Sequence, residues 1–385
     1  MKAIIDGMIV LPDSIVGGHI LLYEDGKILD IVPRKGFRLG HCTELIDANG
    51  GFVVPGFINE HIHGCAGADV MDETPEALQT LQQALPATGV TAFVATTMTY
   101  DRPRLERALE RIRAARGKGS GARILGAHLE GPFISPAYKG AQADTHIVRP
   151  DFSWLRPYAD TICIITLAPE EIVHKTFLKK CHDAGILVSL GHSAATYEDV
   201  QDAMAKSDVY HVTHLYNAMT PFHHRQPGLV GAALLDRRAH CELICDNLHV
   251  HPAAQQLAWR MKGRDGLIIV TDSLRACLQG DGPSELGGQQ VLVQNGEARL
   301  ADGTLAGSVA TMNESLLHFM VNTGASLPDT IALATVNPAK DLGVYDRLGS
   351  LEKGKEADIV ILDSDDFHVK QTVIHGDLVY NEETK

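Results

Sequence analysis

The 385-residue sequence lacks the features that would place it in several large classes of protein. No apolar run approaches the roughly 18 residues that a membrane-spanning helix needs. Residues 1–14 have too short an apolar part and lack the small-residue cleavage site of a signal peptide. Basic residues are not in excess, because the chain has 34 Lys and Arg but 48 Asp and Glu. The resulting net charge of −14 argues against a general nucleic-acid binder. The seven cysteines show no short-chain disulfide pattern, which favours reduced thiols and a cytoplasmic protein.

Several common catalytic motifs are also missing. The sequence has no Gly-x-Ser-x-Gly motif, and no cysteine lies beside the polar groups described below. It has neither a P-loop nor a Gly-x-Gly-x-x-Gly turn between a strand and a helix. These absences argue against a serine or cysteine nucleophile and against the common nucleotide-binding folds.

The middle of the chain alternates short apolar runs with helical patterns. The predicted helices cover residues 75–89, 102–117 and 170–185, among others. The eight apolar runs are FVVPGFI, VTAFVATTMT, RILGAHLE, TICIITLA, GILVSLGH, VYHVTHLY, CELICDN and GLIIVTD. Apolar strands joined by helices indicate a parallel sheet that is buried on both faces. Eight of them predict an α/β fold with a (β/α)8 barrel, and a doubly wound open sheet is the alternative.

Both ends of the chain are rich in short β-like segments separated by turn signals such as Asp25-Gly26. We therefore predict a small discontinuous β domain, built from residues 1–53 and 344–385, around a barrel domain of residues 54–343. Residues 275–310 form a long interruption of the eighth unit, with a hairpin-like stretch. An insertion of this length is typical of a functional loop or lid.

Polar side chains that could bind a metal follow at least six of the predicted strands. In a barrel, the C-terminal ends of the strands hold the active site. His61 and His63 are two residues apart, so an extended chain points both imidazoles to one side. Glu130, His192 and His214 follow other strands and complete a mixed nitrogen and oxygen set that zinc or iron accepts. The sequence therefore predicts a metal site at this end of the barrel.

Asp272 follows the last strand and is the natural general base. A divalent metal lowers the pKa of bound water from 15.7 to about 7. Asp272 would take the proton of this water, which would attack a carbonyl carbon, and would then give the proton to a leaving nitrogen. His249 is placed to polarise the substrate carbonyl, and Arg225 suits a phosphate. These residue types predict metal-dependent hydrolysis of an amide.

The motifs also resemble those of a known family. PGFINEHIHG, HLEGPF with KGAQ, LGHS, THLYNAM with PFHHRQPGLVG, DNLHVHP, TDS and DGTLAGS closely resemble the N-acetylglucosamine-6-phosphate deacetylases of the amidohydrolase superfamily. The resemblance covers essentially the whole chain, and the terminal GSLEKGKEADIVILD resembles the small β-sandwich of that superfamily. It implies hydrolysis of N-acetyl-D-glucosamine 6-phosphate to D-glucosamine 6-phosphate and acetate, within amino-sugar metabolism.

Other functions stay open at this point. The nearest alternative is deacetylation of N-acetylgalactosamine 6-phosphate by an enzyme of the same family. A more distant one is a cyclic-amide hydrolase, although the lysine that such enzymes use is missing from Leu167-Ala168-Pro169 after the fourth strand. A non-catalytic relative is the third, and bound metal would discriminate against it.

The resemblance also implies roles for individual residues. It implies metal ligation by Glu130, His192 and His214, with His61 and His63 for a second ion. Asp272 would be both a ligand and the general base and acid, and His249 would contact the acetyl carbonyl. The implied substrate-binding residues are Ala141, Gln142, Asn217, Ala218, Arg225, His249, Leu305, Ala306, Gly307 and Ser308.

The implied cofactor is one or two divalent ions per subunit, zinc or alternatively iron. The implied assembly is a homodimer in which Arg225 serves the neighbouring subunit's site, and the implied partner is a small phosphorylated amino sugar, not a nucleic acid or a membrane. Two positions depart from the family: Gln142 stands where many members have His, and Asn247 where many have Gly.

Overall fold

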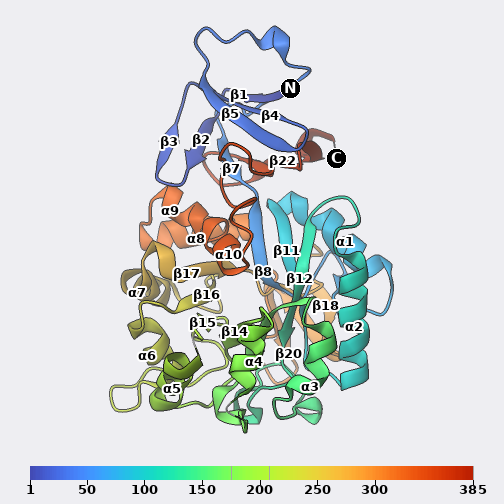
Figure 1. Ribbon diagram of the computed structural model, residues 1–385, viewed down its shortest axis with the longest axis vertical. Helices are drawn as coiled ribbons and strands as arrows, with labels where there is room; N and C mark the ends of the chain where they lie inside the picture. Colours follow the sequence, from blue (N-terminus) through green and yellow to red (C-terminus); the bar gives the residue numbers. More distant parts are fainter. Residues whose placement is uncertain (175, 208, 385) are drawn as a thin grey trace.

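The eight apolar runs supply the strands of one parallel sheet that curls into a barrel, as predicted. The structure is a computed structural model that describes residues 1–174, 176–207 and 209–384. In chain order around the barrel the strands are β8 (Phe57–Ile62), β11 (Val90–Thr97), β12 (Arg123–Glu130), β13 (Ile162–Leu167), β14 (Leu187–Leu190), β15 (His211–Val212), β16 (His240–Ile244) and β17 (Leu267–Val270). Their residues are nearly all buried, because helices cover the outer face (Figure 1).

The first and last strands, β8 and β17, are joined by a seam at the C-terminal end of β8 and just beyond that of β17. The backbone N–H of Asp272 donates to the carbonyl of His61 at 3.0 Å, and the N–H of His63 donates to the carbonyl of Ser273 at 2.9 Å. This seam places the two histidines of the His-x-His motif beside the predicted general base.

Helices surround the barrel (Figure 1). They are α1 (Glu76–Ala84), α2 (Arg102–Ala115), α3 (Phe152–Leu155), α4 (Phe177–Asp183), α5 (Tyr197–Ser207), α6 (Gly228–Leu235), α7 (Pro252–Lys262), α8 (Met312–Thr323), α9 (Leu327–Ala332) and α10 (Val336–Asp341). Across the described part of the chain, none of the helices is both long and apolar enough to cross a membrane.

The helix predicted over residues 170–185 is wrong over residues 170–174, and residue 175 lies outside the described residues. Pro169–Glu171 form a short 3-10 turn, and α4 begins only at Phe177. The carboxylate of Glu170 accepts a hydrogen bond from the Ser193 hydroxyl at 2.7 Å. This long-range contact holds the turn at the end of β14, and a pattern of apolar residues in the sequence does not reveal it.

Both termini contribute to a second domain, where two sheets pack face to face (Figure 1). The four-stranded sheet contains β5 (Lys27–Pro33), β4 (His19–Glu24), β1 (Lys2–Ile5) and β6 (Glu44–Asp47), in that order. The six-stranded sheet contains β23 (Asp377–Asn381), β22 (Val369–Ile374), β21 (Ile359–Leu362), β7 (Phe52–Pro55), β2 (Met8–Leu11) and β3 (Ser14–Val16). Ile4, Leu21 and Ile359 lie in the apolar core of this β-sandwich. The first apolar run is therefore shared, since β7 belongs to the sandwich and β8 to the barrel.

A three-stranded antiparallel meander follows β17, within the segment predicted as a long insertion. Its strands are β18 (Gly282–Leu286), β19 (Gln289–Gln294) and β20 (Glu297–Leu300). The side-chain amide of Gln289 donates to the carbonyl of Ala141. This bond ties the meander to the loop that follows β12, on the side of the barrel where the strands end.

Candidate metal centre and active site

Three predicted site residues adopt a left-handed backbone directly after a barrel strand. The φ angles are 47° for His192, 30° for His214 and 48° for Asp272. L-residues rarely adopt this conformation, which costs of order 1–3 kcal/mol and persists only where the surrounding structure holds it. It turns the chain sharply at the ends of β14, β15 and β17, so that each side chain lies at the mouth of the barrel.

Glu130, the last residue of β12, is the centre on which these side chains converge. Its Oε1 atom lies 3.1 Å from Nε2 of His192 and 3.1 Å from Nε2 of His214. The two imidazole nitrogens are themselves 3.0 Å apart. The Nδ1–H of His192 donates to the carbonyl of Tyr138 at 2.9 Å, which leaves Nε2 as the lone-pair nitrogen that faces Glu130. One carboxylate and two imidazoles in this arrangement can hold a divalent metal.

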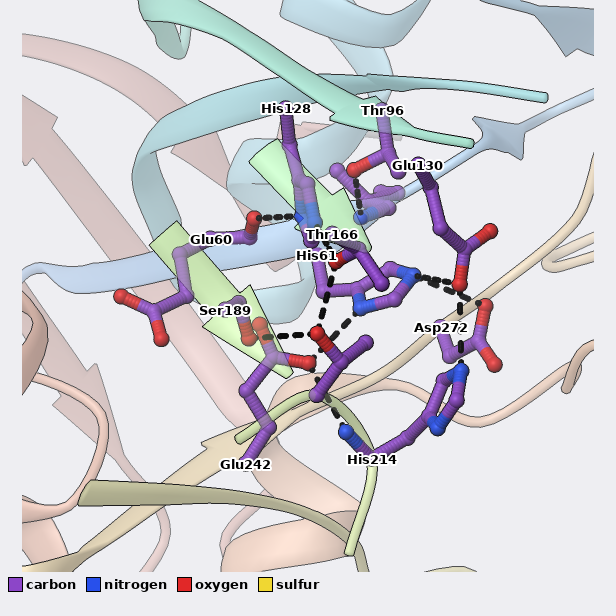
Figure 2. A network of polar contacts seen from close by, with 12 residues as sticks. Glu60, His61, Thr96, His128, Glu130, Thr166, Ser189, His214, Glu242 and Asp272 are labelled. Carbon is purple, nitrogen blue, oxygen red and sulfur yellow. Dashed lines mark hydrogen bonds and ion pairs between the residues drawn. The ribbon is translucent and has the colours of Figure 1, made fainter. Parts of the chain in front are cut away.

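His61 and His63 lie on the other side of Glu130. Nε2 of His63 is 3.3 Å from Oε2 of Glu130 and 3.2 Å from Oδ1 of Asp272. Nε2 of His61 is 3.4 Å and 3.5 Å from Oε1 of Glu130 and Oδ1 of Asp272 (Figure 2). This His61 nitrogen is buried and has no hydrogen-bond partner among the described residues. A buried ring nitrogen that faces two carboxylates without bonding to either fits a metal ligand, so this half of the site also fits a divalent ion.

The imidazoles and carboxylates shift one another's pKa values. Burial raises the pKa of Asp272, but the charges of His61 and His63 outweigh burial and hold this pKa below its usual range. Burial lowers the pKa of His63, yet its hydrogen bonds to Asp272 and Glu130 outweigh burial and raise the pKa to about 9. Without metal, therefore, protons on His61 and His63 balance part of the charge of the carboxylates, and a metal would replace them.

The donor set opens into a cavity of about 230 Å³. The predicted residues that line it are His63, Glu130, Ala141, Gln142, His192, His214, Asn217, Ala218, His249, Asp272, Leu305 and Gly307. Sequence reasoning missed three lining residues, Met98, Gly140 and Leu286, and Thr304, next to the predicted Leu305, also lines the cavity. Leu286 comes from the meander, which thus forms part of the wall. The cavity combines a polar, metal-ligating end with apolar side chains, as small-molecule sites usually do.

His249 is oriented by a carboxylate of its own. Its Nδ1–H donates to Oδ2 of Asp246 at 2.6 Å, so Nε2 is the nitrogen left to face a substrate. Burial lowers the pKa of His249, but the hydrogen bond and charge of Asp246 outweigh burial and raise it. The raised pKa favours the imidazolium form, in which Nε2 also carries a proton and can donate a hydrogen bond to a carbonyl oxygen in the cavity.

Other predicted residues lie behind the cavity or outside it. Ala306 and Ser308 are buried, and the N–H of Ser308 donates to the Asp272 carbonyl at 2.8 Å, so this segment supports the left-handed turn at Asp272. Arg225 lines a separate surface hollow, where its Nη1 is 2.8 Å from Nε2 of His224. Within one subunit, the structure does not bring Arg225 to the metal centre.

Gln142 is buried and held in one orientation. Its amide oxygen accepts from the N–H of Thr99 at 2.9 Å, and its NH2 group donates to Oε2 of Glu130 at 2.9 Å. At this position the chain therefore has a side chain that contacts the central carboxylate directly.

Sequence reasoning also missed buried ionisable residues beneath the ligands. Glu242 lies in β16 and contacts His61, and His128 and Glu60 lie nearby (Figure 2). Glu242 is fully buried. The only signal in the sequence was the position of Glu242 among the apolar residues of the run CELICDN, where an unpaired charge would be costly to bury.

A (β/α)8 barrel with imidazoles and carboxylates converging at the C-terminal ends of its strands defines a metal-dependent hydrolase. Comparison with known proteins gives the same class: the amidohydrolase family matches residues 52–379, and the chain belongs to this family. That family is metal-dependent, in agreement with the donor set described above.

Individual relatives match over nearly their full length. The chain is 40% identical to the N-acetylglucosamine-6-phosphate deacetylase of Bacillus subtilis (strain 168), over 97% of this chain and 96% of the relative. It is 36% identical to the N-acetylgalactosamine-6-phosphate deacetylase of Escherichia coli O157:H7, over 94% of each chain. The crystal structure of the N-acetylglucosamine-6-phosphate deacetylase from Pasteurella multocida superposes with a TM-score of 0.92 at 31% identity, over 98% of this chain and 99% of the other.

Proposed function

We propose that this chain hydrolyses the N-acetyl amide of N-acetyl-D-glucosamine 6-phosphate and releases D-glucosamine 6-phosphate and acetate. The observation that carries the proposal is the convergence of Glu130, Asp272 and four imidazoles, those of His63, His192, His214 and His249, on one cavity. The chain's full-length relatives include N-acetylglucosamine-6-phosphate deacetylases. Because the E. coli relative is an N-acetylgalactosamine-6-phosphate deacetylase, N-acetylgalactosamine 6-phosphate is the alternative substrate.

The chain's own residues divide the work of amide hydrolysis. Glu130, His192 and His214 would hold one divalent ion, and His61, His63 and Asp272 would complete a second position with Glu130. When bound, such an ion supplies Lewis acidity and a water of lowered pKa. Because its pKa lies below the usual range, Asp272 is ionised near neutral pH and can accept a proton from the attacking water. The same carboxyl group then delivers this proton to the leaving nitrogen.

Residues of the cavity wall bind the substrate. His249, held by Asp246, donates to the acetyl carbonyl oxygen, and this bond strengthens as negative charge develops on that oxygen. Asn217, Ala218, Ala141 and Leu305 contact the sugar phosphate from the wall of the cavity. Arg225 binds the phosphate of the neighbouring subunit's substrate in a homodimer.

The native metal is zinc, because a set of imidazoles and carboxylates suits it. The site of action is the cytoplasm, where seven unpaired thiols would stay reduced.

The test is acetate release from N-acetylglucosamine 6-phosphate by metal-loaded protein. Its galacto epimer and unphosphorylated N-acetylglucosamine serve as matched substrates, and chelator-treated protein is the control. Rapid turnover of the gluco compound that needs both phosphate and metal supports the proposal. A preference for the galacto epimer would support the deacetylation chemistry but change the proposed substrate. If metal-loaded protein turns over none of the three compounds, the proposal is refuted.

A further inference from the structure

Glu242 is a fully buried carboxylate that does not line the substrate cavity. It projects from β16, in which its neighbours Cys241, Leu243 and Ile244 are buried and apolar. A carboxylate is expensive to bury unless other groups hydrogen-bond to it. We therefore expect Glu242 to accept hydrogen bonds from groups that its negative charge stabilises.

The partners of Glu242 are two of the candidate metal ligands. Its Oε2 atom accepts from Nδ1–H of His61 at 2.8 Å and from the backbone N–H of His214 at 3.0 Å (Figure 2). His61 comes from β8, whereas His214 follows β15, so this oxygen joins two different sides of the barrel. In the described structure, the second oxygen of Glu242 has no hydrogen-bond partner, so both contacts depend on Oε2.

Each contact fixes something that a metal ligand needs. The bond to Nδ1 places the ring proton of His61 on that nitrogen and leaves the lone pair of Nε2 directed toward Glu130 and Asp272. The bond to the His214 N–H supports a residue whose φ of 30° is unfavourable, and whose side chain faces Glu130. Glu242 thus contacts one ligand from each half of the donor set.

We propose that Glu242 is a positioning residue for the metal centre, which sets the ring orientation of His61 and the backbone of His214. The inference rests on the proposed metal site and extends it beneath the ligands. Loss of the carboxylate should weaken metal binding at the His61 and His63 half most, because only there does Glu242 contact the ligand ring itself. His192 has the Tyr138 carbonyl for the same purpose and should be affected least.

The test compares metal affinity in Glu242→Ala, Glu242→Gln and a matched control, Glu60→Gln. Glu60 is also fully buried and lies in β8, close to Glu242, but its carboxylate bonds to Nε2 of His211, at 3.0 Å, and to none of the candidate ligands. Metal content per subunit is measured by mass spectrometry after dialysis against graded chelator, and the Co²⁺-loaded proteins are compared by their visible absorption, which reports ligand geometry.

We expect Glu242→Ala to weaken metal binding about 10- to 100-fold. Glu242→Gln keeps an acceptor oxygen but loses the charge, so it should fall between Glu242→Ala and the wild type and should alter the Co²⁺ spectrum. Glu60→Gln should bind metal with an affinity within about twofold of the wild type.

Should Glu242→Ala not fold, the comparison of the two Gln variants decides the question. Equal metal affinity and equal spectra in these two variants would overturn the inference. Wild-type protein that takes up no divalent metal would overturn both the inference and the proposed metal requirement, whereas normal metal uptake without deacetylation would overturn the proposed substrate alone.

Discussion

Asp272 faces both the candidate metal ligands and the cavity. It lies within 3.2–3.5 Å of two imidazoles, and it also lines the substrate cavity. The lowered pKa keeps it ionised as a proton acceptor, and its place at the barrel seam puts it where both metal and substrate would bind.

Replacing Asp272 by Asn should abolish catalysis without emptying the site. Asn keeps an oxygen that can face the metal but cannot accept and return a proton. We expect kcat to fall by about 10²–10⁴-fold, the usual contribution of a general acid–base group. Metal content should stay near that of the wild type, and it is measured on the same sample as acetate release. Asp265→Asn, at an exposed aspartate seven positions earlier, is the control and should leave both unchanged. Turnover near the wild-type rate in Asp272→Asn would contradict the assigned role.

His63 makes metal binding dependent on pH. Its pKa in the folded metal-free protein is about 9, against an ordinary value of 6.5. Because the pKa is raised, its contribution to the stability of the metal-free protein is complete below pH 6.5 and is lost as the pH rises through 9. A metal must displace this proton, so affinity should rise between pH 6.5 and 9, by up to about tenfold per pH unit for each proton released. Titration calorimetry in buffers of different ionisation enthalpy measures the protons released at neutral pH. Affinity that does not change across this range would contradict the prediction.

Individual site residues differ in how far the sequence could reveal them. The candidate ligands could be singled out because several imidazoles and a carboxylate follow apolar strands, where such groups are costly to bury unless they bind a metal or a charged partner. Glu242 could not, because its partner His61 is 181 residues away in the chain. The orientation of Gln142 was also out of reach, since it depends on the Thr99 N–H of another strand end.

At the scale of elements, the strands were easier to predict than the turns that follow them. Runs such as LIIV become buried strands because both faces of the barrel sheet are covered. The left-handed residues that come next are not predictable from propensity, because His and Asp adopt this conformation here only under tertiary contacts such as the bond from Ser308 to Asp272. For the same reason the predicted helix failed before Phe177, where Glu170 bonds to Ser193.

The meander is the element most suited to control access to the cavity. It contributes Leu286 to the wall, and Gln289 bonds to the carbonyl of Ala141 on the opposite loop. Gln289→Ala should loosen this closure and lower kcat/KM by about three- to tenfold, with unchanged metal content, because a single hydrogen bond contributes roughly 1 kcal/mol. Gln290→Ala, at the exposed neighbour in β19, is the matched control. Equal kinetics in the two variants would show that this bond does not hold the meander over the site.

At the scale of the molecule, barrel and sandwich are joined by a charged contact at their junction. Arg123, which begins β12, donates to both oxygens of Asp358, one of them at 2.6 Å, and is 2.7 Å from Glu356. The Asp358 side chain is only 5% exposed, so removing its partner leaves a buried charge unpaired. Arg123→Ala should therefore destabilise the protein by on the order of 3 kcal/mol. Arg107→Ala breaks a pair in which both side chains are more than half exposed, and should change stability by less than about 1 kcal/mol. Urea unfolding at fixed metal content compares the two, and a similar small effect in both would contradict the structural importance of the junction.

The assembly of the whole molecule decides what Arg225 does. It lies outside its own subunit's cavity, so its proposed contact with phosphate requires a second subunit. Arg225→Ala alone should raise KM for the phosphorylated sugar by about tenfold or more, since a charged hydrogen bond to phosphate is lost. The decisive experiment mixes Asp272→Asn subunits with Arg225→Ala subunits under conditions that allow exchange, and assays them at low substrate concentration.

If Arg225 serves the neighbouring site, each hybrid dimer contains one site with both groups intact and one that lacks both. Random exchange makes half of the dimers hybrids, so activity should recover to roughly a quarter of the wild-type value. If Arg225 instead served its own subunit, every hybrid site would keep one defect and mixing would restore nothing. The same two proteins mixed without exchange are the control, and a gain that appears only after exchange assigns the phosphate contact to the dimer.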